Sequence, residues 1–261
     1  MSSEVEPNVW AAYLTTFHDR HPGITEQAFN HARHPAVGTP YEWLVAALPD
    51  HPGRVLDVAC GNAPLMARLP DGARYLGLDV SDGELSLAAR SGRGPIIKAD
   101  MRELPLPDGS FDTIVSSMGV MLVQPLTRVF AELARVLRPG GTLAFLVPSM
   151  WPLRLGDLRP GWSVARHLHG PGSMPQHVSG RRARKLLRGA ALQPVEVASR
   201  RFPFPLNSDV DAHLAVHSLY TPGRSSDQLD SAIQALTRMA PDHELPVPLR
   251  RVVAVKPVPG L

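Results

Sequence analysis

The sequence predicts an α/β fold in which helices cover both faces of a mostly parallel sheet, and two observations support this prediction. Between residues 54 and 149, short apolar runs of the kind that form buried strands alternate with segments of helical periodicity. This alternation is typical of a parallel sheet between two helical layers. In addition, Asp79 and Asp100 stand where two of these runs end, and open parallel sheets bind ligands at the carboxyl ends of their strands.

Composition places the chain among ordinary globular proteins. Its 261 residues suffice for one large domain, and 44% apolar and 20% charged content is typical of soluble folds. The net charge of +3 is too small to indicate a nucleic-acid partner, and no apolar run reaches the ~18 residues of a membrane span. The acidic start "MSSEVEPNVW" lacks the basic and apolar regions of a secretory signal, and Cys60 is the only cysteine. We therefore expect a cytoplasmic protein without membrane contacts, and the many arginines, alanines and prolines suggest a bacterial origin.

Three helices are expected before the first strand, over residues 8–18, 25–32 and 39–48. In the first helix, Trp10, Tyr13 and Phe17 recur at helical spacing on one face. The third helix starts at a capping box, in which the side chains of Thr39 and Glu42 satisfy backbone N–H groups at the helix start. A proline at the first helical position supports the same start.

The alternating segment divides into five strands and three helices. The expected strands cover residues 54–59, 73–81, 94–100, 110–118 and 142–149, and the expected helices cover 64–70, 83–90 and 126–141. The last of these helices is amphipathic, and the run Pro139, Gly140 and Gly141 is expected to end it.

Beyond Ser149 the pattern is weaker. Residues 151–178 are rich in Pro, Gly and Trp and have no clear period, so Trp151 and Trp162 are either walls of a substrate pocket or buried residues. Helices are then expected over 179–190, 207–220 and 226–239, and strands over 193–204 and 250–257. Because no hydrophilic linker interrupts the chain, we predict one domain, 1–261. It consists of an N-terminal helical cap (1–50), a ligand-binding core (51–149) and substrate-side insertions with the last strands (150–261).

The loop "DVACGNAPL" at 57–65 follows the first strand and looks like a nucleotide-binding turn. A dinucleotide loop needs G-x-G-x-x-G, but here the pattern falls on Ala59, Gly61 and Pro64, so it fails twice. An adenosyl ligand with a short zwitterionic tail fits better. Asp57 can attract its ammonium group, and N–H groups of the loop can bind its carboxylate.

Alanine in place of glycine sets an expectation for the backbone of this loop. An alanine is tolerated where φ is negative, whereas a left-handed turn is costly for it. We therefore predict negative φ at Ala59 and Ala63, with Gly61 carrying any unusual backbone conformation.

Two further strand ends can complete a nucleoside site. The second predicted strand ends in Asp79, whose carboxylate can accept both hydrogen bonds of a ribose diol. The third ends in Asp100, followed by Met101. A carboxylate and an apolar side chain can bind the amino edge of a purine and pack on its face.

Four motifs containing these residues resemble class I S-adenosylmethionine-dependent methyltransferases, above all the broad bacterial set that acts on small molecules. The motifs are "VLDVACGNAP", "YLGLDVS", "KADMRELPLPDGSFDTIVSS" and "VFAELARVLRPGGTLAFLVP", and they cover about residues 54–148. The resemblance implies S-adenosylmethionine as methyl donor and S-adenosylhomocysteine as product. It also implies a Rossmann-like, seven-stranded sheet of order 3-2-1-4-5-7-6 with the last strand antiparallel, and helical insertions after strands 5 and 6.

The resemblance assigns roles to individual residues. The implied positions are Asp57, Ala59 and Gly61 at the methionine end, Asp79 at the ribose, Val80, Asp100 and Met101 at the adenine, and Ser117 near the sulfonium. The family usually has D-x-G-x-G-x-G, so alanines replace its outer glycines. Met121 and Leu122 stand where many members carry a polar or histidine pair, which removes one common catalytic candidate.

Four histidines are concentrated near the N-terminus and form two H-x-x-H pairs, His18 with His21 and His31 with His34. The pairs suggest a metal site, but no cysteine joins them, so we favour exposed histidines and predict no metal. A further interpretation comes from the resemblance, because N-terminal helices in the family often lie over cofactor and substrate. Tyr13 and His18 are then catalytic candidates, with His18 as a base. Core packing is the alternative for Tyr13.

The sequence thus predicts transfer of a methyl group from S-adenosylmethionine to a small molecule, for which a secondary metabolite is one option. Three alternatives stay open. A nucleic-acid methyltransferase would need a basic face or an added binding domain. A non-methylating, cyclase-like enzyme on the same fold would use the bound sulfonium only for its charge. A binding protein would hold the ligand without turnover. The oligomeric state is not predicted.

Overall fold

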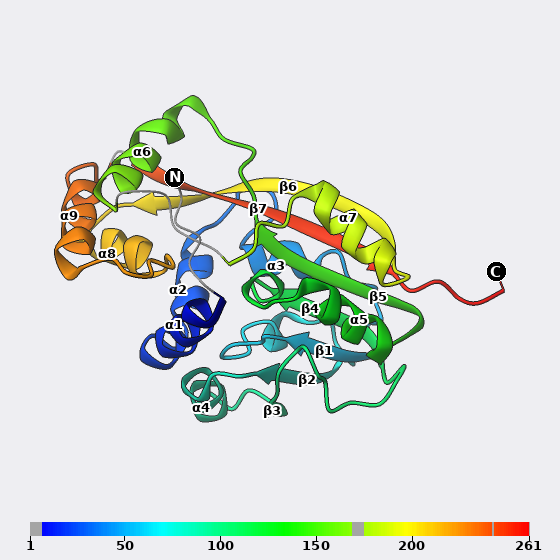
Figure 1. The fold of residues 1–261 in the computed structure, drawn as a ribbon. Helices are drawn as coiled ribbons and strands as arrows, with labels where there is room; N and C mark the ends of the chain where they lie inside the picture. Colours follow the sequence, from blue (N-terminus) through cyan, green and yellow to red (C-terminus); the bar gives the residue numbers. More distant parts are fainter. Residues whose placement is uncertain (1–6, 169–174, 242, 261) are drawn as a thin grey trace.

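The computed structural model describes residues 7–168, 175–241 and 243–260 and contains one seven-stranded sheet (Figure 1). The strands are β1 (Arg54–Val58), β2 (Arg74–Asp79), β3 (Ile96–Lys98), β4 (Phe111–Ser117), β5 (Leu137–Pro148), β6 (Gln193–Leu206) and β7 (His243–Val255). Their order is β3-β2-β1-β4-β5-β7-β6, and β7 runs antiparallel to both of its neighbours. The predicted α/β class, strand order and antiparallel last strand are confirmed.

Helices cover both faces of the sheet because side chains alternate between its two sides. On one face, Leu56, Ile114 and Phe145 pack with buried residues of α5 (Leu126–Val136) and α7 (Gly180–Gly189). On the other face, Val115 and Leu146 pack with a second group of helices. Those helices are α2 (Ile24–His31), α3 (Pro40–Val45), α6 (Leu158–His167), α8 (Asp209–His217) and α9 (Ser226–Thr237).

The N-terminal helices form where the sequence predicts them. Helix α1 (Pro7–Arg20) lies beside α4 (Asp82–Arg90) near the carboxyl ends of β1 and β2 (Figure 1). The capping box of α3 is confirmed, since Thr39 Oγ1 accepts from the Glu42 N–H at 3.2 Å and Glu42 accepts from the Thr39 N–H at 2.6 Å. Residues 1–6 of the predicted cap and 169–174 of the predicted insertion lie outside the described residues.

The last two strands are longer than the sequence indicates. The pairing of β5 with β7 ends where Pro148 lies opposite Leu249. The pairing of β6 with β7 continues past this point, to Leu206 opposite His243. The two strands therefore extend beyond the sheet as a ribbon toward α6, α8 and α9 (Figure 1). Buried Arg201 on this ribbon donates to Asp157 at the start of α6, with Nε 2.8 Å from Oδ2, and so attaches α6 to it.

One expected helix is reduced to a single turn. Residues 64–70 contain only the 3-10 turn η1 (Met66–Arg68), because a segment this short between two prolines does not offset the cost of helix nucleation. Helix α5 ends at Val136, just before the run Pro139 to Gly141 that the sequence predicts to end it, since the proline at 139 disfavours helical backbone at Arg138. Residues 137–141 instead join β5, with Leu137 paired to Phe111.

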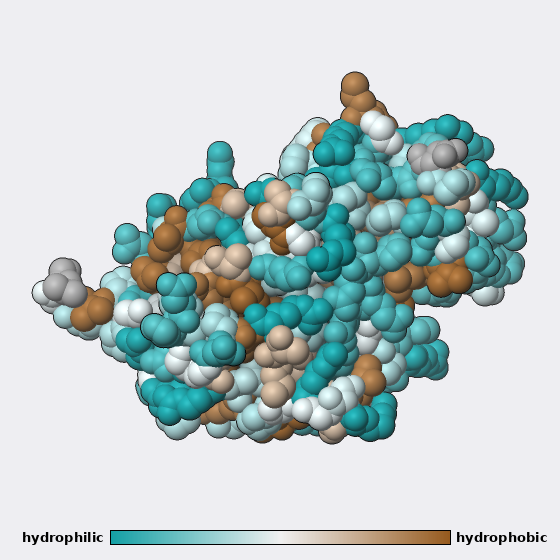
Figure 2. Space-filling model, turned by 180° about the vertical axis from the view of Figure 1, so that it is seen from behind, coloured by the Kyte–Doolittle hydropathy of each residue, from teal (hydrophilic) through white to brown (hydrophobic). Residues whose placement is uncertain are grey.

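The surface of the described residues is mostly hydrophilic with scattered apolar areas on the face shown in Figure 2. Trp151 and Trp162 are 67% and 63% exposed, so neither predicted role, pocket wall or buried residue, describes them. Among the helices that the structure describes, none is long and apolar enough to cross a bilayer.

Candidate active site

Asp57 is a buried acid at the end of β1. Its Oδ2 atom accepts a hydrogen bond of 2.9 Å from the Tyr75 hydroxyl, while its buried Oδ1 atom has no hydrogen-bond partner among the residues that the structure describes. Burial raises the pKa of the Asp57 carboxyl to about 8, with the Tyr75 hydrogen bond opposing the rise and the charge of Asp79 adding to it. An unsatisfied buried carboxyl oxygen is costly unless a ligand supplies a donor.

The loop after β1 does not have the predicted backbone. Ala59 has φ of 54° and Ala63 has φ of 57°, both in the left-handed region, as does Gly61 at 54°. The prediction of negative φ at the two alanines is wrong. One physical reason is visible opposite Ala59, where Gly119 makes room: a Cβ atom on Gly119 would lie only 2.3 Å from that of Ala59. The glycine that lets this turn form is therefore 60 residues away (119 minus 59), on the segment after β4.

Asp79 joins the first two strand ends. Its Oδ2 atom accepts from the Gly61 N–H at 2.8 Å, and its Oδ1 atom accepts from the N–H groups of Val80 and Ser81 at 2.7 and 3.0 Å. These bonds hold the loop against the second strand. Because a carboxylate has about four acceptor positions and three are used here, Asp79 keeps one, on Oδ2, for a ligand hydroxyl. Val80 next to it is 49% exposed.

Asp100 has an internal partner that the sequence interpretation did not include. Arg102 donates from Nε to both carboxylate oxygens, at 3.1 and 3.0 Å, and its guanidinium holds the pKa of Asp100 below the usual range. The predicted contact of Asp100 with an adenine amino group therefore competes with this ion pair. Met101 is buried and lies in the pocket wall.

The segment after β4 supplies the floor of the pocket. Ser117 has a buried Oγ atom without a hydrogen-bond partner, which makes it the second unsatisfied polar group at the site. Leu122 lines the pocket, whereas Met121 is fully buried in the core between the sheet and α5. Where many members of the family carry a polar pair, this chain thus has one apolar residue in the cavity wall and one in the core.

The two catalytic candidates on α1 have different surroundings. His18 lies in the pocket wall, with Nδ1 3.1 Å from Glu84 Oε1 and Nε2 3.0 Å from the Tyr220 hydroxyl. The Tyr13 hydroxyl instead accepts from the Thr221 N–H at 2.8 Å, and its ring packs against Trp10 and Phe17. Tyr13 is therefore a packing residue, as the alternative prediction stated, and it is not among the described residues that line the cavity.

The other N-terminal histidines are not arranged around a common point. His31 contacts Asp211 at 3.2 Å and the Pro205 carbonyl at 3.0 Å, and His34 Nδ1 accepts from the Ala36 N–H. Within the described ranges, no three His, Cys, Asp or Glu side chains come together in a way that could hold a metal ion.

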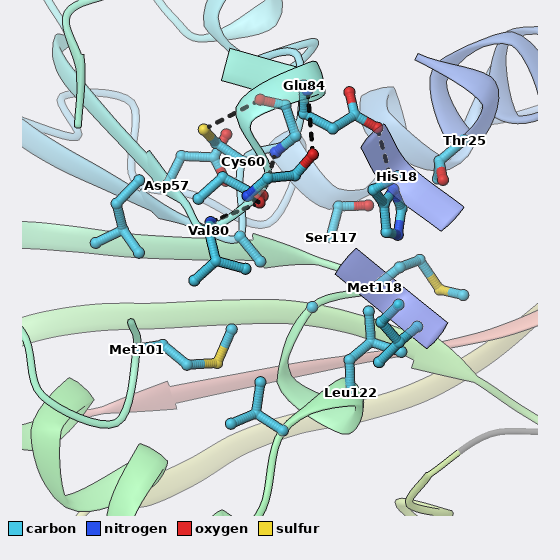
Figure 3. A pocket seen from close by; sticks show the side chains of 18 of the residues that line it. His18, Thr25, Asp57, Cys60, Val80, Glu84, Met101, Ser117, Met118 and Leu122 are labelled. Carbon is cyan, nitrogen blue, oxygen red and sulfur yellow. Dashed lines mark hydrogen bonds and ion pairs between the residues drawn. The ribbon is translucent and has the colours of Figure 1, made fainter. Parts of the chain in front are cut away.

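One cavity of about 420 Å³ lies at the carboxyl ends of the strands, and its wall includes Asp57, Asp79, Asp100, Ser117 and His18. In Figure 3, Val80 and Met101 lie on one side of the cavity, His18 and Thr25 on the other, and Ser117 between them. The residues present fit an adenosyl ligand with a charged amino-acid tail. The decisive observation is the unpartnered oxygen of Asp57, which a ligand ammonium group can satisfy.

Comparison with known proteins agrees with this geometry. Residues 56–145 match the family model described as "Methyltransferase domain". This segment is a methyltransferase domain. It contains the loop after β1, the strand ends at Asp79 and Asp100 and the floor after β4, so it overlaps all four sequence motifs and holds the strand-end part of the site.

Relatives of the methyltransferase domain act in different reactions. The chain is 35% identical over 119 residues to a malonyl-[acyl-carrier protein] O-methyltransferase of Methylococcus capsulatus, covering 42% of each chain. It is 34% identical over 108 residues to a demethylmenaquinone methyltransferase of Thermus thermophilus, covering 38% of this chain and 49% of the relative. The matches thus span about half the length of these relatives or less.

A solved structure shows the same fold over nearly the whole chain. The [4+2]-cyclase SpnF superposes with a TM-score of 0.61 over 94% of this chain and 96% of its own, at 19% identity. At that identity the likeness concerns the fold, which includes the regions outside the methyltransferase domain.

Proposed function

We propose that the protein transfers a methyl group from S-adenosylmethionine to a small-molecule acceptor. The observation that carries this proposal is the buried, unpartnered Asp57 oxygen beside two further acidic strand ends, which all belong to the methyltransferase domain and line one cavity. When bound, S-adenosylmethionine supplies a methyl group on sulfur that is already activated for transfer.

The residues of the chain divide the ligand between them. Asp57 pairs with the ammonium group, and backbone N–H groups of the loop are available to the carboxylate. Asp79 accepts from a ribose hydroxyl through its remaining acceptor position, while Val80 and Met101 border the adenine and Asp100 bonds its amino group beside Arg102. Ser117 lies nearest the reacting end, where its free hydroxyl can bond ligand or acceptor.

The apolar walls of the cavity exclude water and align the acceptor. Trp10 and Leu14 of α1 and Leu122 after β4 line the cavity together with the polar groups. They exclude water and hold the acceptor atom in line with the methyl group, which are the main requirements of such a transfer.

A small molecule is the acceptor that the comparisons favour. The relatives described above carry names that refer to malonyl-[acyl-carrier protein] and demethylmenaquinone, and a cavity of about 420 Å³ is of the size that a small ligand fills. We assign the activity to the cytoplasm of a bacterium, in keeping with the single cysteine and the bacterial relatives. In this proposal residues 1–50 act as a cap, 51–149 as cofactor-binding core and 150–261 as the acceptor side of one domain.

Two measurements test the proposed function. Calorimetry with S-adenosylhomocysteine should show binding that Asp79→Ala weakens at least about tenfold, because a charge-assisted hydrogen bond contributes about 1.5–3 kcal/mol. Asp108→Ala is the matched control, since Asp108 contacts Arg135 on the surface. Equal affinity in wild type and Asp79→Ala would contradict the site assignment.

Turnover is tested with the methyl-labelled donor and fractionated bacterial metabolite pools. Mass spectrometry should find an acceptor that gains one methyl group. Binding without methyl loss in any fraction would contradict the proposal and favour a non-methylating use of the fold, as the name of the [4+2]-cyclase illustrates for that protein.

A further inference from the structure

The strongest unexplained feature of the cavity is a line of three hydrogen-bonded side chains from distant parts of the chain. Glu84 of α4, His18 of α1 and Tyr220 after α8 all line the cavity. Glu84 Oε1 is 3.1 Å from His18 Nδ1, and His18 Nε2 is 3.0 Å from the Tyr220 hydroxyl. Figure 3 shows the contact between Glu84 and His18 at the side of the cavity opposite Met101.

The surroundings fix the direction of these hydrogen bonds. The Glu84 side chain is only 3% exposed, and its second oxygen accepts from the Gly23 N–H at 3.0 Å. A carboxylate that accepts at both oxygens requires the ring proton of neutral His18 to be on Nδ1. Nε2 then has a free lone pair, so the Tyr220 hydroxyl donates to it. The remaining acceptor positions of the Tyr220 oxygen are left for a group in the cavity.

Burial disfavours ionisation of the Tyr220 hydroxyl. Tyr220 is nearly buried, its ring packs edge-on against Phe17 with centroids 5.0 Å apart, and burial together with Glu84 raises its pKa. Tyr220 therefore does not ionise alone at neutral pH, but it can pass its proton to His18 while receiving another. Among the described residues, the other titratable groups that interact with these side chains are Asp19 and Tyr13 of α1, Tyr41 of α3 and Asp79 at the end of β2.

We propose that Tyr220 is a catalytic residue that deprotonates a hydroxyl-bearing acceptor, with His18 and Glu84 as positioning residues behind it. This proposal rests on the proposed methyl transfer and specifies its acceptor class: an alcohol or phenol, whose oxygen must lose a proton, rather than a carboxylate, which needs no base.

The step balances without a further reactant. As the oxygen–methyl bond forms and the carbon–sulfur bond breaks, the acceptor hydroxyl gives its proton to the Tyr220 oxygen, and Tyr220 gives its own proton to His18 Nε2. The electron pair of the broken bond remains on sulfur. His18, now cationic beside Glu84, releases its proton to water, to which its side chain is 18% exposed.

The direct test is the protonation state of the His18 ring in the intact protein. Nitrogen NMR of protein labelled at histidine, assigned with His18→Gln, should show the Nδ1–H form near neutral pH. Tyr220→Phe should move the Nε2 resonance selectively, because it removes the donor to that atom. An Nε2–H form would overturn the proposal whatever the activity.

Kinetics give the second test. Tyr220→Phe should lower kcat for hydroxyl acceptors about 100-fold or more with little change in KM. Glu84→Gln should lower kcat less, because it removes the carboxylate charge beside His18 but leaves an oxygen that can accept from Nδ1, and it should change the pH profile of kcat. The control is His213→Gln on α8, whose exposed ring contacts the Asp209 carbonyl away from the cavity, and it should change kcat less than about twofold.

Binding of S-adenosylhomocysteine separates the two proposals. All three variants of the kinetic test should bind S-adenosylhomocysteine with wild-type affinity. This result would show that they fold and that the donor site is intact. Wild-type kcat in Tyr220→Phe, or transfer only to carboxylates, would overturn the relay while the proposed function stands. Wild type that binds the ligand but methylates nothing would refute the proposed function and, with it, the relay.

Discussion

At the scale of single residues, Asp57 has the most consequential environment. Its pKa of about 8 means that the carboxyl is mostly protonated at pH 7 in the free protein. A cationic ligand group next to its unpartnered oxygen favours the ionised form and lowers this pKa. Binding is then linked to release of a proton.

We therefore expect about one proton to be released on binding S-adenosylhomocysteine at pH 7. Calorimetry in buffers of different ionisation enthalpy measures it directly. Release should disappear at pH 9 and above, where Asp57 is already ionised, and in Asp57→Asn at any pH. Heats that do not depend on the buffer at pH 7 would contradict the raised pKa of Asp57.

A second prediction at this scale concerns the pair Ala59 and Gly119. Gly119→Ala would bring two methyl groups to 2.3 Å, so the turn must shift, and overpacking of this kind costs about 1–3 kcal/mol. Ala59→Gly removes the clash and also suits the positive φ at 59. In a double-mutant cycle by urea unfolding, the double variant should recover most of the loss. Additive effects would show that the two positions are independent.

At the scale of elements, the contact between α1 and α4 positions the cap. The backbone of α1 approaches Gly83 so closely that a Cβ atom there would lie 2.8 Å from the Asp19 Cα. Asp19 also accepts from the Gly83 N–H at 3.0 Å and from the Ser81 hydroxyl at 2.8 Å. The helix that carries His18 is thus held on the core by backbone proximity and by one carboxylate.

Gly83→Ala should displace α1, because the added methyl group would meet backbone atoms of α1, which cannot rotate away as the end of a flexible side chain can. We expect weaker S-adenosylhomocysteine binding and faster proteolysis within α1, with a loss of about 1–3 kcal/mol in unfolding free energy. Gly189→Ala at the end of α7 is the control, since no atom lies within 4 Å of the added methyl group. Unchanged proteolysis of α1 in Gly83→Ala would mean that the cap is held elsewhere.

At the scale of the whole molecule, the cavity joins segments from both ends of the chain. Residues from α1, from four strand ends and from Tyr220 share its wall. A ligand in the cavity should therefore stabilise all of them together, although only the strand ends belong to the methyltransferase domain.

Hydrogen exchange should show this coupling. S-adenosylhomocysteine is expected to slow exchange in α1 and in the loops after β1, β2 and β4, and to leave the distal ends of β6 and β7 unchanged. Protection confined to residues 56–145 would show that the N-terminal helix does not close over the ligand.

The sequence predicts those parts of the fold in which local pattern and tertiary structure agree. The strands up to β5 and the acids Asp57 and Asp79 follow from apolar runs and from what stands at their ends. The backbone of Ala59 could not be predicted, because its space comes from Gly119 on the segment after β4, 60 residues along the chain. The partners of His18 were equally hidden, since Glu84 and Tyr220 are 66 and 202 residues away.

The single thiol of the protein, finally, reports on the site it borders. Cys60 lies in the cavity wall with its Sγ–H directed to the Gly61 carbonyl at 3.4 Å, and burial raises its pKa well above the usual range. A buried, protonated thiol does not react with alkylating reagents. Since the sequence has no other cysteine, the rate of alkylation measures how often the loop opens. A bound ligand should slow this alkylation, and no cysteine has to be engineered for the measurement.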